Sequence, residues 1–216
     1  MKFNTLLFDL DGTLTDPMMG ITNSVMYALK KYGIDETDRQ KLCKFIGPPL
    51  SESFEKYYGF SKEQATEAVE FYREYFAPKG LFENAVIEGT EQMLDALKSS
   101  GAKMVLATSK PIIFANKILA HFDLDKYFDV TVGSNLDGTL GTKSEVIAEA
   151  LKLAKVTDRT TAAMIGDRKH DIIGAKENGI TPIGVTFGYG SFDELKTAGA
   201  EYILDSMKDL TEFLLK

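Results

Sequence analysis

Cysteine and histidine are scarce in this chain of 216 residues, which contains one cysteine and two histidines. The single cysteine, Cys43, excludes an internal disulfide and any metal site built from several cysteines, and it suits a reducing, cytoplasmic compartment. Two histidines leave little scope for a histidine-based zinc site. No apolar run approaches the roughly 20 residues that span a bilayer, and the first residues lead into a short strand, not a signal peptide. We therefore expect no membrane partner.

Positive charge is also in short supply, because 25 lysines and arginines face 32 acidic residues and leave a net charge of -7. Affinity for nucleic acid depends largely on the neutralisation of phosphates by basic side chains, so this balance argues against a nucleic-acid partner. A small phosphorylated metabolite remains compatible, since it needs only a local positive site. The composition does not decide between a monomer and a homodimer.

The first part of the chain combines one strand with a run of helices. The apolar residues 5–8 end at Asp9 and a glycine turn, which is typical of a buried strand. Asp16 and Pro17 fit the N-cap and first position of a helix that Gly33 closes. Further helices are expected at 38–46, 50–58 and 62–76, the last with a capping box from Ser61 to Gln64.

Beyond residue 80, short apolar segments alternate with helical ones. Strands are expected at 104–107, 130–132, 163–165, 183–185 and 202–204. This alternation is typical of a parallel sheet covered by helices on both faces. The sequence therefore predicts a doubly wound α/β core from residues 1–15 and 83–216, with a small all-helical cap domain at 16–82 and linkers near Asp16 and Lys79.

Ligands of open α/β sheets bind beyond the carboxyl ends of the strands, and polar residues gather at those positions here. Acids, hydroxyls and one lysine follow the first four core strands: Asp9 and Asp11, then Thr108 and Ser109, then Lys143, then Asp167 and Asp171. Such a set suits phosphoryl transfer, in which positioning and charge neutralisation dominate.

The first acidic pair offers a nucleophile and a proton donor. Asp9 and Asp11 are two residues apart, so at an extended strand end both carboxylates point to one side. One can attack phosphorus while the other donates and later removes a proton. Gly12 lets loop amides approach the substrate, and these amides and the Thr108 hydroxyl can bind the equatorial phosphoryl oxygens.

Several carboxylates and a phosphate dianion would repel one another without a cation. Lys143 would balance part of the negative charge, and a hard cation with oxygen ligands would balance the rest. Mg²⁺ is bound through few carboxylates plus waters, and Asp9 and Asp167 are the expected ligands.

Four segments resemble, in order, the motifs of the haloacid dehalogenase-like hydrolase superfamily: Asp9-Leu10-Asp11-Gly12-Thr13, Thr108, Lys143 and Gly166-Asp167-Arg168-Lys169-His170-Asp171. The helical insertion is similar to the cap of the phosphoglycolate phosphatase-like subgroup, whose members hydrolyse phosphoglycolate, nucleotides, pyrophosphate or sugar phosphates. The resemblance implies a Rossmann-like core and a Mg²⁺-dependent phosphatase that works through an aspartyl-phosphate intermediate. The expected substrate is a small monoester of the phosphoglycolate or nucleoside monophosphate type.

The resemblance also assigns roles to the acids. It implies that Asp9 is the nucleophile and a metal ligand, and that Asp11 is the general acid/base and lends its backbone carbonyl to Mg²⁺. Asp167 completes the protein ligands, and Asp171 orients the site or ligates through water. The second acid, at position 11, also favours a phosphatase over a dehalogenase, which lacks it.

Each of these residues also has an ordinary structural interpretation. An isolated Asp-Gly-Thr is usually a turn, and residues 135–140 nearly repeat residues 9–14, although Asn135 offers no carboxylate and we expect a loop there. A lysine at a helix start, such as Lys143, is ordinarily solvent-facing. Asp171 could be an acid stabilised by the dipole at a helix start.

The hydroxyls and the residues beside the motifs leave alternatives open. Thr108 and Ser109 are both candidates for the hydroxyl that binds the phosphate, and either could instead cap the helix that begins near Pro111. The family pattern favours Thr108 for the phosphate-binding role. Arg168, Lys169 and His170 could be exposed helix residues, or one could contact a substrate or brace a carboxylate. The cap loop 45–50 could select the leaving group or simply join two helices.

Three other functions compete with a phosphatase. A β-phosphoglucomutase-like phosphotransferase resembles this architecture and returns the phosphoryl group to a sugar. A phospho-acceptor domain of the receiver type gathers similar residues, but its acceptor ends the third strand, whereas Asp9 ends the first. A non-hydrolytic binding protein on the same fold is less favoured, because the set of acids is intact.

Overall fold

The computed structural model describes residues 2–216, which form two compact units. The core unit comprises the chain up to Asp16 and from Val86 onward, and the helical unit comprises Pro17–Ala85. Lys79 therefore belongs to the helical unit. The strands β2 (Thr15–Asp16) and β3 (Ala85–Val86) pair as a two-stranded sheet where the chain passes from one unit to the other.

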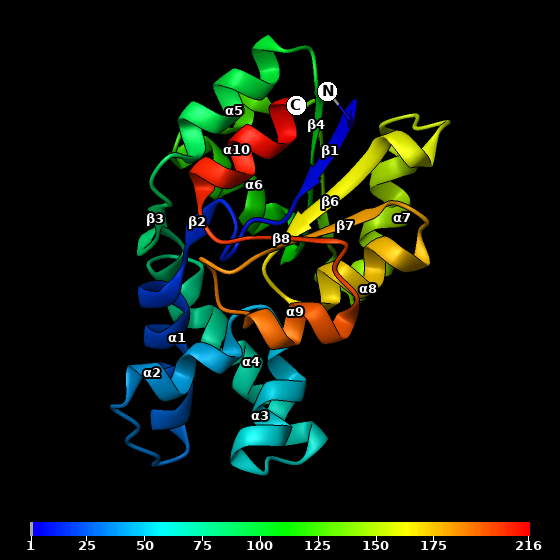
Figure 1. The fold of residues 1–216 in the computed structure, drawn as a ribbon. Helices are drawn as coiled ribbons and strands as arrows, with labels where there is room; N and C mark the ends of the chain where they lie inside the picture. Colours follow the sequence, from blue (N-terminus) through cyan, green and yellow to red (C-terminus); the bar gives the residue numbers. More distant parts are fainter. Residues whose placement is uncertain (1) are drawn as a thin grey trace. The chain divides into compact units, whose positions relative to one another are not determined.

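Six strands form the sheet of the core unit in the order β5-β4-β1-β6-β7-β8, and all of their pairings are parallel (Figure 1). The strands are β1 (Thr5–Phe8), β4 (Lys103–Pro111), β5 (Val130–Ser134), β6 (Ala162–Gly166), β7 (Thr181–Val185) and β8 (Tyr202–Leu204). In the register of the central strand, Leu7 lies between Val105 and Met164. All three are fully buried, as both faces of a parallel sheet require.

Helices cover both faces of this sheet (Figure 1). One face carries α7 (Lys143–Leu153), α8 (Lys169–Glu177) and α9 (Phe192–Ala198), and the other carries α5 (Thr90–Ser99), α6 (Ile112–His121) and α10 (Met207–Leu215). Short 3₁₀ turns lie at Gly80–Phe82, Asp125–Tyr127 and Arg159–Thr161. The predicted doubly wound α/β core is confirmed. The strands β4 and β5 lie on one side of β1, and β6, β7 and β8 lie on the other. Such folds bind ligands at the carboxyl end of the strand where the strand order reverses, which here is β1.

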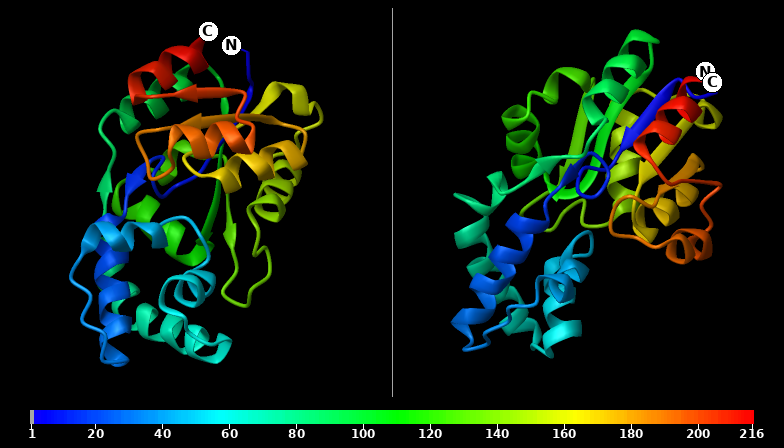
Figure 2. Two further views of the ribbon diagram at one scale, coloured as in Figure 1. Left: turned by 60° about the horizontal axis from the view of Figure 1, so that its bottom comes forward. Right: turned by 60° about the vertical axis from the view of Figure 1, so that its left-hand side comes forward.

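The two ends of the described chain lie side by side in the core unit (Figure 2). The ring centroids of Phe3 and Phe213 are 6.5 Å apart, and those of Tyr202 and Phe213 are 4.6 Å apart. Lys2 Nζ lies 4.5 Å from the centroid of the Tyr202 ring. Aromatic packing thus joins the start of the chain to β8 and α10.

The helical unit contains the expected helices. They are α1 (Met18–Lys31), α2 (Arg39–Leu42) with the 3₁₀ turn Cys43–Phe45, α3 (Leu50–Tyr58) and α4 (Lys62–Phe76). The predicted capping box at the start of α4 is present, with Ser61 and Gln64 each bonding the other's backbone. Phe45 and Phe54 are buried, and their ring centroids are 5.0 Å apart, so aromatic packing forms the core of this unit.

The predicted N-cap of α1 is wrong. The helix begins at Met18, Pro17 occupies the N-cap position, and no side chain caps it. Asp16 ends β2 instead, and its Oδ1 accepts a hydrogen bond from the Tyr189 hydroxyl. Strand pairing and a distant partner therefore replace the local capping bond.

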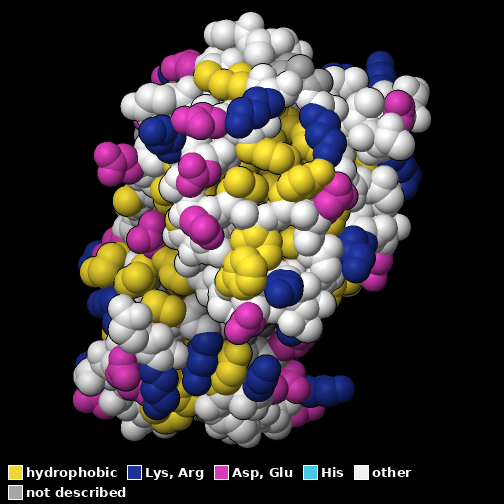
Figure 3. Space-filling model, in the orientation of Figure 1, with side chains coloured by type: hydrophobic (Ala, Val, Ile, Leu, Met, Phe, Trp, Pro, Cys, Tyr) yellow, Lys and Arg dark blue, Asp and Glu magenta, His cyan; other side chains and the backbone are white. Residues whose placement is uncertain are grey.

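The surface charge and the character of the helices bear on possible partners. Acidic and basic side chains are interspersed over the face drawn in Figure 3. Within residues 2–216, no helix combines the length and apolar character that crossing a bilayer demands. The absence of a nucleic-acid partner remains a prediction from the net charge.

Candidate active site

The segment after β1 turns sharply and carries Asp9 and Asp11. The Leu10 carbonyl accepts three backbone N–H groups of this turn, those of Thr13, Leu14 and Thr15. Gly12 has a φ of +80°, and a Cβ there would lie 2.3 Å from Asp167 Oδ2. Only glycine fits, both for its backbone angle and for this close approach. The turn is thus fixed by its own backbone bonds and by contact with the second acidic motif.

Lys143 lies among the acids. Its Nζ donates hydrogen bonds to Asp9 Oδ1 at 2.7 Å and to the Ala107 carbonyl at 3.0 Å, and it pairs with Asp171 Oδ1 at 2.8 Å. Its side chain is only 4% exposed, so the solvent-facing alternative is wrong. Burial alone would lower the pKa of Lys143, but the Asp171 and Asp9 carboxylates raise it overall, and the amine stays protonated.

Three acids gather beside this lysine. Asp9, Asp167 and Asp171 each place a carboxylate oxygen within 4.8 Å of the others, and all three are buried. Burial raises the pKa of Asp167 well above its ordinary value, and the Asp171 and Asp9 carboxylates raise it further. Burial also raises the pKa of Asp171 to about 6, against the lowering effect of Lys143. The carboxylates of this cluster therefore repel one another when they are ionised.

Asp171 serves a helix and the cluster together. At the third position of α8, its Oδ2 accepts the Arg168 backbone N–H at 3.0 Å, while Oδ1 pairs with Lys143. The structural interpretation of Asp171, as an acid at a helix start, is confirmed, and the same side chain also reaches the acidic cluster. Asp167 differs, because its Oδ1 is buried and has neither a hydrogen-bond partner nor an ion pair within the described part of the chain, whereas Asp171 Oδ1 has the ion pair with Lys143. An oxygen in that state suits coordination of a cation.

The donor set fits Mg²⁺. Acidic side chains outnumber basic ones at this end of the sheet, where four acids lie with two lysines: Asp9, Asp11, Asp167, Asp171, Lys110 and Lys143. The ligand atoms on offer are all oxygens, which a hard cation prefers. Asp9 and Asp167 are the best placed, since both oxygens of Asp171 already have partners.

The two candidate hydroxyls differ in their surroundings. Thr108 is 2% exposed, and its Oγ1 accepts the Lys110 backbone N–H at 3.2 Å. Ser109 is partly exposed, and its carbonyl accepts the Ser134 hydroxyl at 2.8 Å. Neither side chain caps α6, where Pro111 holds the N-cap position without a side-chain bond. The capping alternative is wrong, and Thr108 remains the candidate for binding phosphate.

Comparison with known proteins decides the family. Residues 6–185 match the family described as haloacid dehalogenase-like hydrolase. The chain belongs to this family. A 5'-nucleotidase from Pseudomonas aeruginosa is 48% identical over 196 residues, which cover 91% of this chain and 88% of that protein.

Two further relatives of this haloacid dehalogenase-like hydrolase cover nearly the whole chain. The structure of a predicted phosphatase from Clostridium acetobutylicum has a TM-score of 0.95 and 51% identity, over 100% of this chain and 99% of that one. A pyrophosphatase, PpaX, from Halalkalibacterium halodurans is 30% identical over 214 residues, 99% of this chain and 98% of that protein. The prediction of a phosphoric monoester hydrolase of this family is confirmed.

Sequence reasoning missed Lys110. Its Nζ donates to Asp11 Oδ2 at 2.5 Å, and the two side chains are 6% and 12% exposed. Burial raises the pKa of Asp11, and Lys110 opposes that rise. The partners are 99 positions apart, so no local spacing signals the pair. The available clue was the place of Lys110, just after Thr108 at a strand end.

The loop between β7 and α9 was also missed. The Tyr189 backbone N–H donates to Asp167 Oδ2 at 2.7 Å, and the Tyr189 hydroxyl donates to Asp16 Oδ1. A Cβ at Gly188 would lie 2.5 Å from Asp167 Cβ, and one at Gly190 would lie 1.8 Å from its carbonyl oxygen. These two glycines beyond a strand end were the signal that the loop approaches the site.

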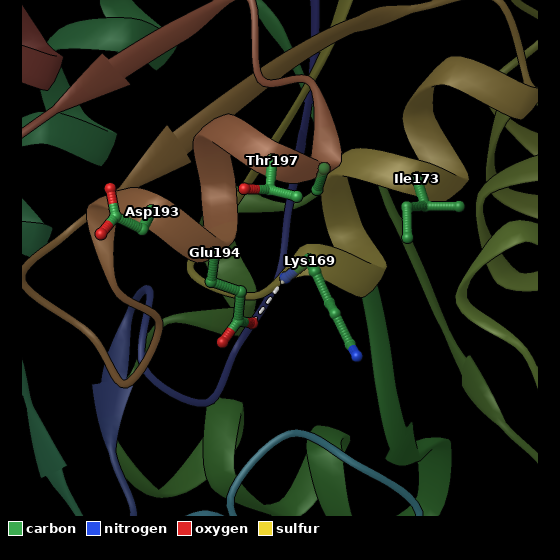
Figure 4. A pocket seen from close by; sticks show the side chains of 6 residues that line it. Lys169, Ile173, Asp193, Glu194 and Thr197 are labelled. Atoms are coloured by element: carbon green, nitrogen blue, oxygen red, sulfur yellow. Dashed lines mark hydrogen bonds between the residues drawn. The ribbon is translucent and has the colours of Figure 1, made fainter.

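The residues after Asp167 are held by α9. Arg168 Nε and the Lys169 backbone N–H both donate to Glu194 Oε1, at 3.0 and 2.9 Å, and Figure 4 shows the second bond. A groove of about 460 Å³ between α8 and α9 is lined by Lys169, Ile173, Asp193, Glu194, Thr197 and Ala198. The catalytic candidates do not line it. Arg168 thus braces a carboxylate of α9.

The second Asp-Gly-Thr segment forms the expected loop. Asp137 is exposed, and its Oδ1 accepts the backbone N–H and the hydroxyl of Thr139 at 2.9 and 2.7 Å. Asn135 Nδ2 donates to the same hydroxyl at 2.8 Å. These hydrogen bonds join residues of the same turn. Asp137 does not belong to the acidic cluster.

Proposed function

We propose that this enzyme hydrolyses a small phosphate monoester with the help of Mg²⁺, through an aspartyl-phosphate intermediate on Asp9. The observation that carries the proposal is the buried cluster at the carboxyl end of β1, where Lys143 Nζ lies 2.7 Å from Asp9 Oδ1. Phosphoryl transfer requires a positioned acceptor and neutralised charge, and this cluster supplies both.

In the first step, an Asp9 oxygen attacks phosphorus while the bond from phosphorus to the leaving oxygen breaks. Asp11 gives its proton to that oxygen, so that the product leaves as an alcohol. In the second step, Asp11 takes a proton from water, which attacks the phosphorus and releases inorganic phosphate from Asp9. Lys143 holds the Asp9 carboxylate in place through both steps.

Asp9, Asp167 and the Asp11 backbone carbonyl would hold Mg²⁺, and Asp171 would orient the site. The metal would neutralise the charge between the carboxylates and the phosphoryl oxygens. The Tyr189 N–H fixes one oxygen of Asp167 and so directs the other. The Thr108 hydroxyl and the amides of the loop at Gly12 bind the phosphoryl oxygens that bear charge in the transition state.

Within this proposal, a nucleoside monophosphate is the first substrate class to test. It is supported by the 48% identity to a 5'-nucleotidase over most of both chains. Phosphoglycolate and pyrophosphate follow, the latter because a pyrophosphatase is also a relative. A cytoplasmic location, inferred from the single cysteine, belongs to the same proposal.

The test is release of inorganic phosphate, with Mg²⁺ or with EDTA, from nucleoside monophosphates, phosphoglycolate, pyrophosphate, hexose phosphates and an activated aryl phosphate. We expect Mg²⁺-dependent release with one class preferred by kcat/KM. Asp9→Asn should lower kcat by roughly 10³-fold or more and leave the fold intact, because the change is nearly isosteric and removes the nucleophile.

Asp137→Asn is the matched control, since it alters the Asp-Gly-Thr segment that lies outside the cluster, and it should keep wild-type turnover. Absence of hydrolysis on every ester would contradict the proposal. Transfer of the phosphoryl group to a sugar in place of water would support the β-phosphoglucomutase-like alternative.

A further inference from the structure

We propose that Lys110 is a positioning residue for proton transfer. It holds the Asp11 carboxylate by Oδ2 and leaves Oδ1 to exchange the proton with the leaving group and with water. The inference rests on the proposed function, in which Asp11 is the general acid/base. It assigns different tasks to the two oxygens of one carboxylate.

The geometry of the pair separates these two oxygens. Lys110 Nζ donates to Asp11 Oδ2 at 2.5 Å, and both side chains are largely buried, at 6% and 12% exposure. Asp11 Oδ1 is buried and has no hydrogen-bond partner among residues 2–216. A charge-assisted bond of this kind fixes direction as well as distance.

The backbone at Lys110 is itself held in place. The register between β4 and β5 shifts after Thr108, and irregularities of this kind redirect side chains beside active sites. The Lys110 N–H donates to Thr108 Oγ1 at 3.2 Å, and Ser134 Oγ donates to the Ser109 carbonyl at 2.8 Å. Gly133 makes room, because a Cβ there would lie 2.5 Å from the Lys110 carbonyl oxygen.

The two buried lysines serve different acids. Lys143 contacts Asp9 and Asp171, whereas Lys110 contacts Asp11. The strand irregularity therefore places a second lysine beside the proton donor. Since proton transfer needs the donor oxygen within a few tenths of an ångström of its productive position, a fixed Asp11 contributes directly to rate.

This role predicts a dependence on the leaving group. An alkyl leaving oxygen, as in a nucleoside monophosphate, needs a proton as it departs, whereas an activated aryl oxygen leaves readily as an anion. Loss of Lys110 should therefore slow alkyl esters much more than aryl esters. A contribution of Lys110 to phosphate binding or to folding would slow both equally.

The experiment compares kcat/KM of wild type and Lys110→Met for a nucleoside monophosphate and an activated aryl phosphate, on one preparation of each protein. The parameter kcat/KM reports the steps up to departure of the leaving group. An inactive fraction of a preparation lowers kcat/KM equally for both substrates, so it does not change the alkyl-to-aryl ratio. We expect a fall of about 10- to 100-fold for the alkyl ester and less than about threefold for the aryl ester. Lys110→Arg should restore part of the alkyl activity.

A double-mutant cycle tests whether Lys110 acts through Asp11. In an Asp11→Asn background, Lys110→Met should cause no further change in the alkyl-to-aryl ratio, because the group that it positions is already lost. Lys117→Met, on the exposed surface of α6, is the matched control and should leave both rates unchanged.

Equal losses on both esters, or an unchanged ratio in Lys110→Met, would overturn the positioning role while leaving the phosphatase intact. A further fall of the ratio in the Asp11→Asn background would overturn it as well. A wild-type enzyme that hydrolyses neither ester would instead remove the proposed function on which the inference rests.

Discussion

Asp167 shows how a single buried side chain is prepared for a cation. One oxygen is fixed by the Tyr189 N–H, and the other has no hydrogen-bond partner within residues 2–216. The residue is fully buried, and burial raises its pKa. A buried carboxylate that lacks compensation is costly, so a bound metal ion should stabilise the folded protein.

Asp167→Asn is therefore expected to abolish stabilisation by Mg²⁺. At a Mg²⁺ concentration of 100 times its Kd, wild type should gain about 2.7 kcal/mol in free energy of unfolding, and the variant almost none. Thermal melts with Mg²⁺ and with EDTA measure the difference. Asp137→Asn, in the self-contained loop, should keep the full wild-type shift, and a full shift in Asp167→Asn would show that the metal binds elsewhere.

At the scale of elements, Glu194 joins the starts of two helices. It accepts bonds from Arg168 and Lys169 at the start of α8, while Ser191 caps its own helix, α9. Partial burial alone would raise the pKa of Glu194, but the Lys169 N–H and Arg168 lower it overall. The bond network thus favours the charged carboxylate. It keeps the segment after Asp167 in place.

The lowered pKa gives a pH dependence with a definite sign. The contribution of Glu194 is present above its ordinary pKa of 4.5 and is lost as the pH falls through the lower folded value. Glu194→Gln should cost about 1 kcal/mol of unfolding free energy at pH 7, and less near pH 4. Urea denaturation at both pH values measures this, with exposed Asp193→Asn as the control. An equal cost at both pH values would contradict the charge-based account.

At the scale of the molecule, each unit has a core of its own. The core unit buries its sheet between two layers of helices, and the helical unit is built around aromatic side chains. Phe54 is fully buried there, 5.0 Å from Phe45 and 5.8 Å from Phe60 between ring centroids. Damage to this cluster should therefore act first on the helical unit.

Phe54→Ala should destabilise the helical unit by about 3–5 kcal/mol, because it leaves a cavity among aromatic rings. Hydrogen exchange measured by mass spectrometry should show faster exchange in α3 and α4, with β1 and β6 unchanged. Phe192→Ala, at a side chain that is 51% exposed, serves as the control. Equal acceleration in both units would show that they unfold together.

Local patterns in the sequence determined much of this protein. The strands at 5–8 and 202–204, the capping box at Ser61 and the acids at strand ends all follow from neighbours within a few residues. Hydrophobic period and capping chemistry are properties of such short segments, so they could be predicted before any fold was known. The order of the motifs was also sufficient to indicate the family.

Only the tertiary structure decided which distant groups meet. The pairing of Lys110 with Asp11 spans 99 positions, and that of Tyr189 with Asp16 spans 173. Both pairings depend on the strand order around β1, which brings the loops beyond the strand ends together. The same order buries Lys143, which a helix start alone would leave in solvent. The sequence specified the chemical groups, and the packing of the sheet decided which of them lie close enough to pair.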